Sequence, residues 1–167
     1  MNRNSCPLCR DFLVEPSGPS DASVLLVGEY PGYYEIQSGI PFVGPSGDVL
    51  KQELAKVSVD WRRVRLTNLW LHNKKEKDEA EVNYHLGRLI QEMEGRRAVL
   101  LMGSDTSKTI LDANVLEVSG LEMKSPLVPP SVEVLMATVN PAFVLHDTVG
   151  EFRLAIQKFF RKAKKFL

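Results

Sequence analysis

The sequence predicts an α/β fold with three layers (α/β/α) around a four-stranded parallel sheet. Four short apolar runs alternate with segments of helical periodicity, which is typical of strand–helix units. Two of these runs end at glycine and two are closed by asparagine, as expected where a strand gives way to a loop. A length of 167 residues is enough for one domain with its own core, so we expect residues 1–167 to form a single domain.

The predicted strands are residues 24–27, 64–67, 98–102 and 132–137. Gly28 and Gly103 directly follow the first and third strands, and Asn68 and Asn140 close the second and fourth. Ligands of open parallel sheets bind beyond the carboxyl ends of the strands. We therefore expect a functional site where these four ends meet.

Apolar residues at three- and four-residue spacing predict the helices. The predicted helices are residues 46–54, 78–94, 105–113 and 151–167, and the predicted loops are 15–20, 31–47 and 125–131. The last helix has an apolar stripe from Phe152 to Leu167 and a strongly basic opposite face.

The composition excludes several classes of protein. With 44% hydrophobic and 25% charged residues the chain is neither disordered nor fibrous, and its two cysteines exclude a disulfide-rich framework. Its 21 basic and 21 acidic residues argue against coating nucleic acid by bulk charge. No apolar run approaches the roughly 20 residues of a membrane span, and the start lacks a signal-peptide core. We expect a soluble, cytoplasmic protein without a membrane partner.

The segment from the first strand into the helix at residue 46 is the most informative. The strand runs into Gly28-Glu29-Tyr30-Pro31-Gly32, a turn that would aim one carboxylate out of the end of the sheet. Phe42 follows in Pro41-Phe42-Val43-Gly44. Glycine lets a ligand approach the backbone, and an aromatic ring offers a stacking surface. Taken singly, Phe42 also suits the core and Glu29 also suits a turn.

In combination, these motifs resemble the uracil-DNA glycosylase superfamily, closest to its iron–sulfur-containing branch (family 4-like), which carries GEAPG and PFVG. Three further motifs extend the resemblance over nearly the whole chain, in the family's order. They are Leu66-Thr67-Asn68, Leu101-Met102-Gly103-Ser104 and Thr138-Val139-Asn140-Pro141-Ala142.

The resemblance implies a monofunctional DNA glycosylase that hydrolyses the N-glycosidic bond of uracil or a modified pyrimidine flipped out of DNA. Phe42 would stack on the flipped base and Asn68 would bind its pairing edge. Glu29 would orient or activate water, and Asn140 would contact the leaving base. DNA would be the partner of a monomeric enzyme of base-excision repair.

Two residues depart from the family pattern. Asn140 stands where the family has the histidine of His-Pro-Ser, and an amide donates a hydrogen bond without supplying charge. Tyr30 stands where the family has a small residue, and its ring would reshape the pocket or contact the target base. One reading is therefore activity on hypermodified bases of viral DNA, and an alternative is a catalytically silent DNA-binding module. An unrelated nucleotide hydrolase is disfavoured because the sequence has no GxxxxGK[ST] loop.

Other residues of these motifs suggest contacts with DNA. Pro141, Phe143 and Leu145 lie where the superfamily inserts an apolar wedge into the minor groove, although a helix start packed on the core fits equally. His146 would contact phosphate or be exposed. Gly103 and Ser104 would cradle a phosphate or cap the following helix.

Cys6 and Cys9 form a CxxC pair near the N-terminus, where no strand precedes them to favour a redox site, so we expect metal binding. The resembled branch holds its cluster with four cysteines. Here His72 stands four residues after Asn68, at the position of the third cysteine, and His85 stands near that of the fourth. Two thiolates and two imidazoles suit Zn2+, with an iron–sulfur cluster as the alternative. Residues 1–20 would form the N-terminal metal-binding segment.

Overall fold

The computed structural model describes residues 3–73, 78–145 and 149–167. Its centre is a sheet of four parallel strands in the order β2-β1-β3-β4. The strands are β1 (Val24–Gly28), β2 (Arg65–Asn68), β3 (Ala98–Met102) and β4 (Val134–Thr138). Gly28 pairs with Asn68 and Met102 pairs with Thr138, so the carboxyl ends of the strands meet at one edge.

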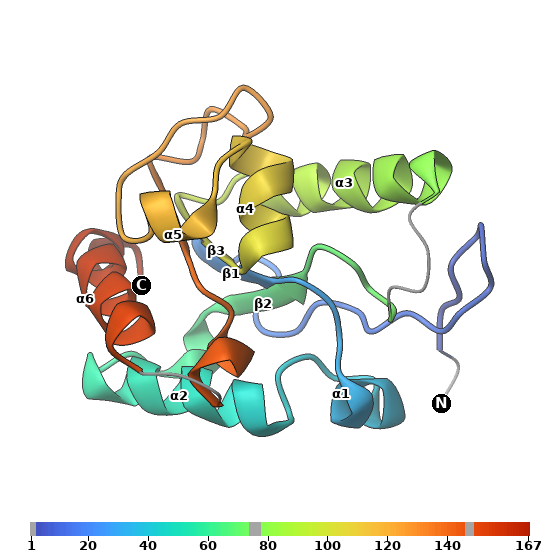
Figure 1. The fold of residues 1–167 in the computed structure, drawn as a ribbon, viewed down its shortest axis with the longest axis horizontal. Helices are drawn as coiled ribbons and strands as arrows, with labels where there is room; N and C mark the ends of the chain where they lie inside the picture. Colours follow the sequence, from blue (N-terminus) through green and yellow to red (C-terminus); the bar gives the residue numbers. More distant parts are fainter. Residues whose placement is uncertain (1–2, 74–77, 146–148) are drawn as a thin grey trace.

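Helices cover both faces of the sheet, with α3 and α4 on one side and α2 and α6 on the other (Figure 1). The helices are α1 (Tyr33–Ser38), α2 (Pro45–Lys56), α3 (Glu79–Met93), α4 (Ser104–Leu111), α5 (Val115–Val118) and α6 (Gly150–Ala163). Three 3-10 helices are η1 (Trp61–Arg63), η2 (Pro141–Leu145) and η3 (Lys164–Phe166). The predicted three-layer fold with a four-stranded parallel sheet is confirmed.

Local chemistry explains where the helices begin and end. The Asp78 side chain accepts hydrogen bonds from the amides of Ala80 and Glu81 at the start of α3. A proline at the first position of α2 lacks the N–H that a helix start leaves unused. Our prediction of a continuous loop over residues 31–47 is wrong, because α1 forms there between Gly32 and the left-handed Gly39.

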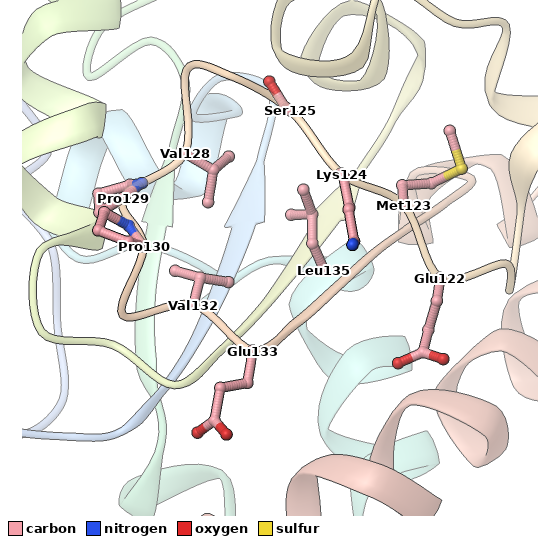
Figure 2. Close-up of a pocket in the computed structure, with 10 residues that line it drawn as sticks. All are labelled: Glu122, Met123, Lys124, Ser125, Val128, Pro129, Pro130, Val132, Glu133 and Leu135. Atoms are coloured by element: carbon pink, nitrogen blue, oxygen red, sulfur yellow. The ribbon is translucent and has the colours of Figure 1, made fainter.

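The connection that leads into β4 bounds a surface pocket of about 360 Å³ near the start of that strand (Figure 2). Val128, Val132 and Leu135 supply apolar side chains, and Glu122 and Glu133 stand at its sides. This pocket lies at the opposite end of β4 from the converging carboxyl ends.

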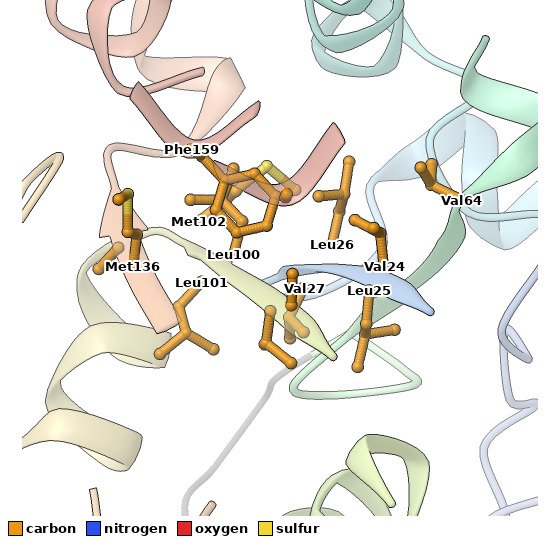
Figure 3. Packing of buried hydrophobic residues seen from close by; sticks show 14 of the residues in the cluster. Val24, Leu25, Leu26, Val27, Val64, Leu100, Leu101, Met102, Met136 and Phe159 are labelled. Atoms are coloured by element: carbon orange, nitrogen blue, oxygen red, sulfur yellow. The ribbon is translucent and has the colours of Figure 1, made fainter. Parts of the chain in front are cut away.

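The core is packed against both faces of the two central strands, β1 and β3, whose residues are all buried. Figure 3 shows Leu26, Leu100 and Met102 on the side of Phe159 from α6, and Leu25 and Leu101 on the opposite side. Burial on both faces is why these strands read as continuous apolar runs instead of alternating ones. Among the described residues, no helix is long and apolar enough to cross a membrane.

Candidate active site and metal centre

The carboxyl ends of the strands bring the predicted catalytic and base-binding residues together. A cleft of about 570 Å³ is lined by Glu29, Tyr30 and Asn140. A much smaller cavity of about 20 Å³ adjoins it, lined by the same three residues together with Phe42 and Asn68. A space of that size holds about one water molecule, so a side chain must move before a pyrimidine can enter. Tyr30 is 47% exposed and has room to do so.

Phe42 and Asn68 face each other across Gly28. A Cβ placed at Gly28 would lie 2.8 Å from Phe42 Cζ and 2.4 Å from Asn68 Oδ1, so only glycine leaves room between them. Both side chains are buried, and Phe42 has a left-handed backbone with φ of +58°. Such a conformation costs free energy for a non-glycine residue and persists only where surrounding contacts enforce it.

The backbone that follows Phe42 is held by the carboxylate of Glu35 in α1, a residue that the sequence analysis missed. Glu35 is 6% exposed, and its Oε2 accepts hydrogen bonds from the amides of Val43 at 3.2 Å and Gly44 at 2.6 Å. Its Oε1 accepts from the amide of Gly32 at 3.1 Å. One carboxylate thereby joins the loop that carries Glu29 to the loop that carries Phe42.

The carboxylate of Glu29 lies at the N-terminus of α4. Its Oε1 accepts a hydrogen bond from the amide of Asp105 at 3.1 Å, and the positive end of the helix favours the ionised carboxylate. Gly103 has φ of +124°, and a Cβ there would lie 2.1 Å from Glu29 Oε1. Gly103 is therefore packed against Glu29, while Ser104 is exposed and lines the cleft.

The backbone at the end of β2 is fixed from two sides. The amides of Leu69 and Trp70 donate to the carbonyls of Gly28 and Glu29 at 2.9 and 2.8 Å. On the other side, the Arg88 guanidinium of α3 donates to Thr67 Oγ1 at 3.0 Å and to the carbonyls of Asn68 and Leu69. Burial lowers the pKa of Arg88 to about 10, so the guanidinium stays charged at neutral pH.

Asn140 is held at the start of η2, where its Oδ1 accepts a hydrogen bond from the amide of Ala142 at 2.9 Å. This bond occupies the oxygen and leaves the Nδ2 group as the donor available to a ligand in the cleft. Within η2, Pro141 is buried, whereas Phe143 and Leu145 are 43% and 49% exposed. His146 lies outside the described residues.

The predicted metal ligands lie close together where the N-terminal segment contacts α3 and the residues after β2. Cys9 Sγ is 3.5 Å from His72 Nε2, and His72 Nε2 is 3.1 Å from His85 Nε2. A fifth donor that the sequence analysis missed, Glu81, is 3.1 Å from His72 Nε2 through its Oε2 and 3.7 Å from Cys6 Sγ through its Oε1. Glu81 precedes His85 by one helical turn of α3, which is the signal that would have revealed it.

The environment of these donors is largely dry. Cys6, His72, Glu81 and His85 are buried, and Cys9 is exposed. Desolvation, followed by the hydrogen bond with Glu81, raises the pKa of the Cys9 thiol to about 12. Desolvation, followed by repulsion from His72, lowers the pKa of His85 to about 4, so its imidazole is neutral.

Comparison with known proteins identifies the family. The profile of the uracil DNA glycosylase superfamily matches residues 15–164. A type-4 uracil-DNA glycosylase of Pyrobaculum aerophilum is 29% identical over 174 residues, which cover 95% of this chain and 88% of the relative. A type-4 uracil-DNA glycosylase of Thermotoga maritima is 24% identical over 170 residues, covering 98% and 88%. The chain therefore belongs to the uracil DNA glycosylase superfamily and is similar to its type-4 branch, as the motifs at the four strand ends predicted.

Proposed function

We propose that this chain is a monofunctional DNA glycosylase that hydrolyses the N-glycosidic bond of uracil or of a modified pyrimidine flipped out of DNA. The observation that carries the proposal is the convergence of Glu29, Phe42, Asn68 and Asn140 on one cleft at the carboxyl edge of the sheet. The names of the type-4 relatives support uracil as the substrate.

In the proposed reaction, the buried ring of Phe42 stacks on the flipped base while Asn68 binds its pairing edge. Breaking the bond leaves positive charge on the sugar and negative charge on the base. The ionised carboxylate of Glu29 stabilises the sugar and orients the attacking water, and Asn140 Nδ2 donates to the departing base. Water is the nucleophile, because the motifs that line the cleft contain no lysine to form a Schiff base.

We propose that DNA binds at the rim of the cleft. The exposed side chains of Phe143 and Leu145 on η2 would fill the gap left by the flipped base, with Pro141 fixing their backbone. Gly103, Ser104 and His146 remain proposed contacts to the DNA backbone. Tyr30 would contact the base itself or reshape the pocket, and the proposed targets therefore include hypermodified bases of viral DNA.

We further propose that the chain is a cytoplasmic monomer with one domain over residues 1–167, whose first 20 residues bind a metal. The metal is zinc, held by Cys6, Cys9, His72 and a fourth ligand from α3, where Glu81 and His85 both face His72. Elemental analysis should find about one zinc per chain. A metal-free and stably folded protein would contradict this part of the proposal.

The enzyme proposal is tested with duplexes that each carry one pyrimidine lesion, including uracil, scored for alkali-labile abasic sites. We expect cleavage of at least one lesion, strong loss in Glu29→Gln and Asn68→Ala, and no loss in the exposed control Glu94→Gln. Absence of cleavage at stoichiometric enzyme would contradict the proposal. Binding of a lesion without cleavage would establish the alternative, a silent recognition module, which Asn140 in place of histidine favours.

A further inference from the structure

Four of the five potential metal donors lie close enough together to bind one ion. Cys6, Cys9, His72 and Glu81 each offer one atom, and these four atoms all lie within 4.8 Å of one another. The set joins the N-terminal turn, the segment after β2 and the first turn of α3. Backbone bonds from Cys6 N to the Asp11 carbonyl and from Arg10 N to the Cys6 carbonyl fix the turn that carries both thiols.

Three of the separations within this set match the edges of a tetrahedron around one ion. Zinc bonds of about 2.3 Å to sulfur and about 2.0 Å to nitrogen or oxygen place a sulfur about 3.5 Å from a light donor. They place two light donors about 3.3 Å apart. The measured separations are 3.5 Å for Cys9 to His72, 3.7 Å for Cys6 to Glu81 and 3.1 Å for His72 to Glu81.

The same set does not fit the iron–sulfur cluster that the resemblance implies. Such a cluster takes four thiolates, or two thiolates and two imidazoles in its Rieske form, and the set of Cys6, Cys9, His72 and Glu81 is neither. A multi-iron core also separates its ligands more widely than one ion does, whereas all four donors here lie within 4.8 Å of one another. The chemistry and the spacing both favour a single cation.

The hydrogen bonds of the two imidazoles distinguish their roles. His72 Nδ1 is 3.0 Å from the carbonyl of Asn73, which accepts the ring proton and leaves Nε2 free to bind a metal. His85 Nδ1 instead faces the amide of Leu71 at 3.5 Å, which acts as a donor. A metal bound to His85 Nε2 would place the ring proton on Nδ1. That proton would then point at the N–H of Leu71, so two donors would face each other. The environment of His85 thus favours a proton on Nε2. A nitrogen that binds a metal carries no proton, so this tautomer does not suit a ligand.

We infer that a single divalent cation is held by Cys6, Cys9, His72 and Glu81, with His85 outside the coordination sphere. This inference rests on the zinc site of the proposed function and deepens it by assigning the fourth ligand and excluding a cluster. The cation would join the N-terminal segment to both β2 and α3. His85 would act as a packing and positioning residue beneath His72, where its ring also contacts Trp70 at 5.0 Å between centroids.

X-ray absorption at the zinc edge of the unmodified, zinc-loaded chain tests the ligand set without any mutation. We expect two sulfur and two nitrogen or oxygen neighbours, with the outer-shell scattering of one imidazole. Reconstitution with cobalt(II) should give the absorption bands of a tetrahedral site with thiolate ligands. Scattering from two imidazoles would overturn the assignment of Glu81. Iron with inorganic sulfide would overturn the single-ion site.

Variants compare the two candidates on α3 directly. Glu81→Gln should lower zinc affinity by at least about 100-fold, since it removes a ligand, whereas His85→Gln should lower it by about tenfold and keep the tetrahedral cobalt spectrum. Glu79→Gln, exposed in the same turn, is the matched control and should leave affinity unchanged. Unchanged affinity in Glu81→Gln, or loss of metal in His85→Gln alone, would overturn the inference. These measurements do not depend on glycosylase activity, so failure of the enzyme proposal remains distinguishable.

Discussion

The carboxylate of Glu35 accepts a 2.6 Å hydrogen bond from the backbone amide of Gly44, and through it holds the loop of Phe42 against the loop of Glu29. The two residues lie on different structural elements, α1 and the start of α2. A single buried carboxylate therefore ties the backbone that follows Phe42 to the loop that carries Glu29.

Glu35→Gln should weaken this link. Glutamine keeps one oxygen but turns an N–H₂ group toward a backbone N–H, so we expect a loss of about 2 kcal/mol in the free energy of unfolding. Misplacement of Phe42 should lower kcat/KM on uracil-containing DNA by roughly 10- to 100-fold. Denaturant titration and single-turnover kinetics measure both effects, with Glu94→Gln as the control. Full activity in a folded Glu35→Gln variant would contradict the positioning role.

Gly103→Ala should displace Glu29. The added methyl group would lie 2.1 Å from Glu29 Oε1 on a backbone with φ of +124°. We expect at least about 1 kcal/mol of destabilisation and a strong loss of base excision. Gly95→Ala is the matched control, because Gly95 also has a positive φ but has nothing within 4 Å of the added carbon. Equal loss of activity in both variants would show that backbone strain alone is responsible.

Asn140→His should increase the rate of uracil excision. A histidine at this position can donate a charged hydrogen bond to the departing base, and one such donor is typically worth about 10²–10³ in rate. We expect at least a tenfold gain under single-turnover conditions, and a loss in Asn140→Ala. A slower Asn140→His variant would indicate that the amide serves another target base.

Leu145→Ala and Phe143→Ala should each lower base excision from double-stranded DNA more than from single-stranded DNA. Both side chains are exposed on η2, where they can fill the space of a flipped base. We expect excision from duplex DNA to fall by about tenfold or more, with little change on single strands, which need no wedge. Equal loss on both substrates would instead assign these residues to the fold.

The ion pair between Glu53 and Arg153 should make stability depend on pH. Arg153 of α6 donates to both oxygens of Glu53 in α2, at 2.9 and 3.0 Å. These hydrogen bonds lower the pKa of Glu53 from its ordinary value of 4.5. A lowered carboxyl pKa gives stability that is present above the unfolded-state value and is lost as the pH falls through the folded-state value.

Arg153→Met should therefore be less stable than the parent at pH 7, and the difference should shrink as the pH falls below the ordinary Glu53 pKa of 4.5. Denaturant titrations at pH 7, 5, 4 and 3 measure the trend. Lys56→Met is the control, because Lys56 also contacts Glu53 but is half exposed. A constant difference across this range would assign the effect of Arg153 to packing instead of charge.

The sequence predicted most elements because their signals are local. The continuous apolar runs of β1 and β3 reflect burial on both faces, and the strand ends at Gly28 and Asn68 follow from glycine and asparagine. The short helix α1 was missed because six residues carry too little periodicity to show a pattern. Glu35 in this helix caps the amide of Gly32 locally, while its other two amide partners, Val43 and Gly44, come from a different loop.

The residues of the candidate site that belong to a sequence motif were predictable. Those that reach the site only through the packing of α3 were not. Cys6 and Cys9 follow from the CxxC spacing and His72 and His85 from the family resemblance, whereas Glu81 lies one helical turn before His85 and the packing of α3 places it beside His72. Arg88 likewise looks like an ordinary helical arginine in the sequence. Only the packing of α3 on β2 brings its guanidinium to the carbonyl of Asn68.

β4 lies at the edge of the sheet, beside β3, and it is synthesised after the other three strands. The candidate metal donors lie within residues 6–85, whereas Asn140 follows β4. During synthesis, the half that carries the candidate metal donors is available before the half that completes the candidate cleft. On the proposed function, the nascent chain gains the capacity to cut bases from DNA only after β4 has joined the sheet and brought Asn140 to the cleft.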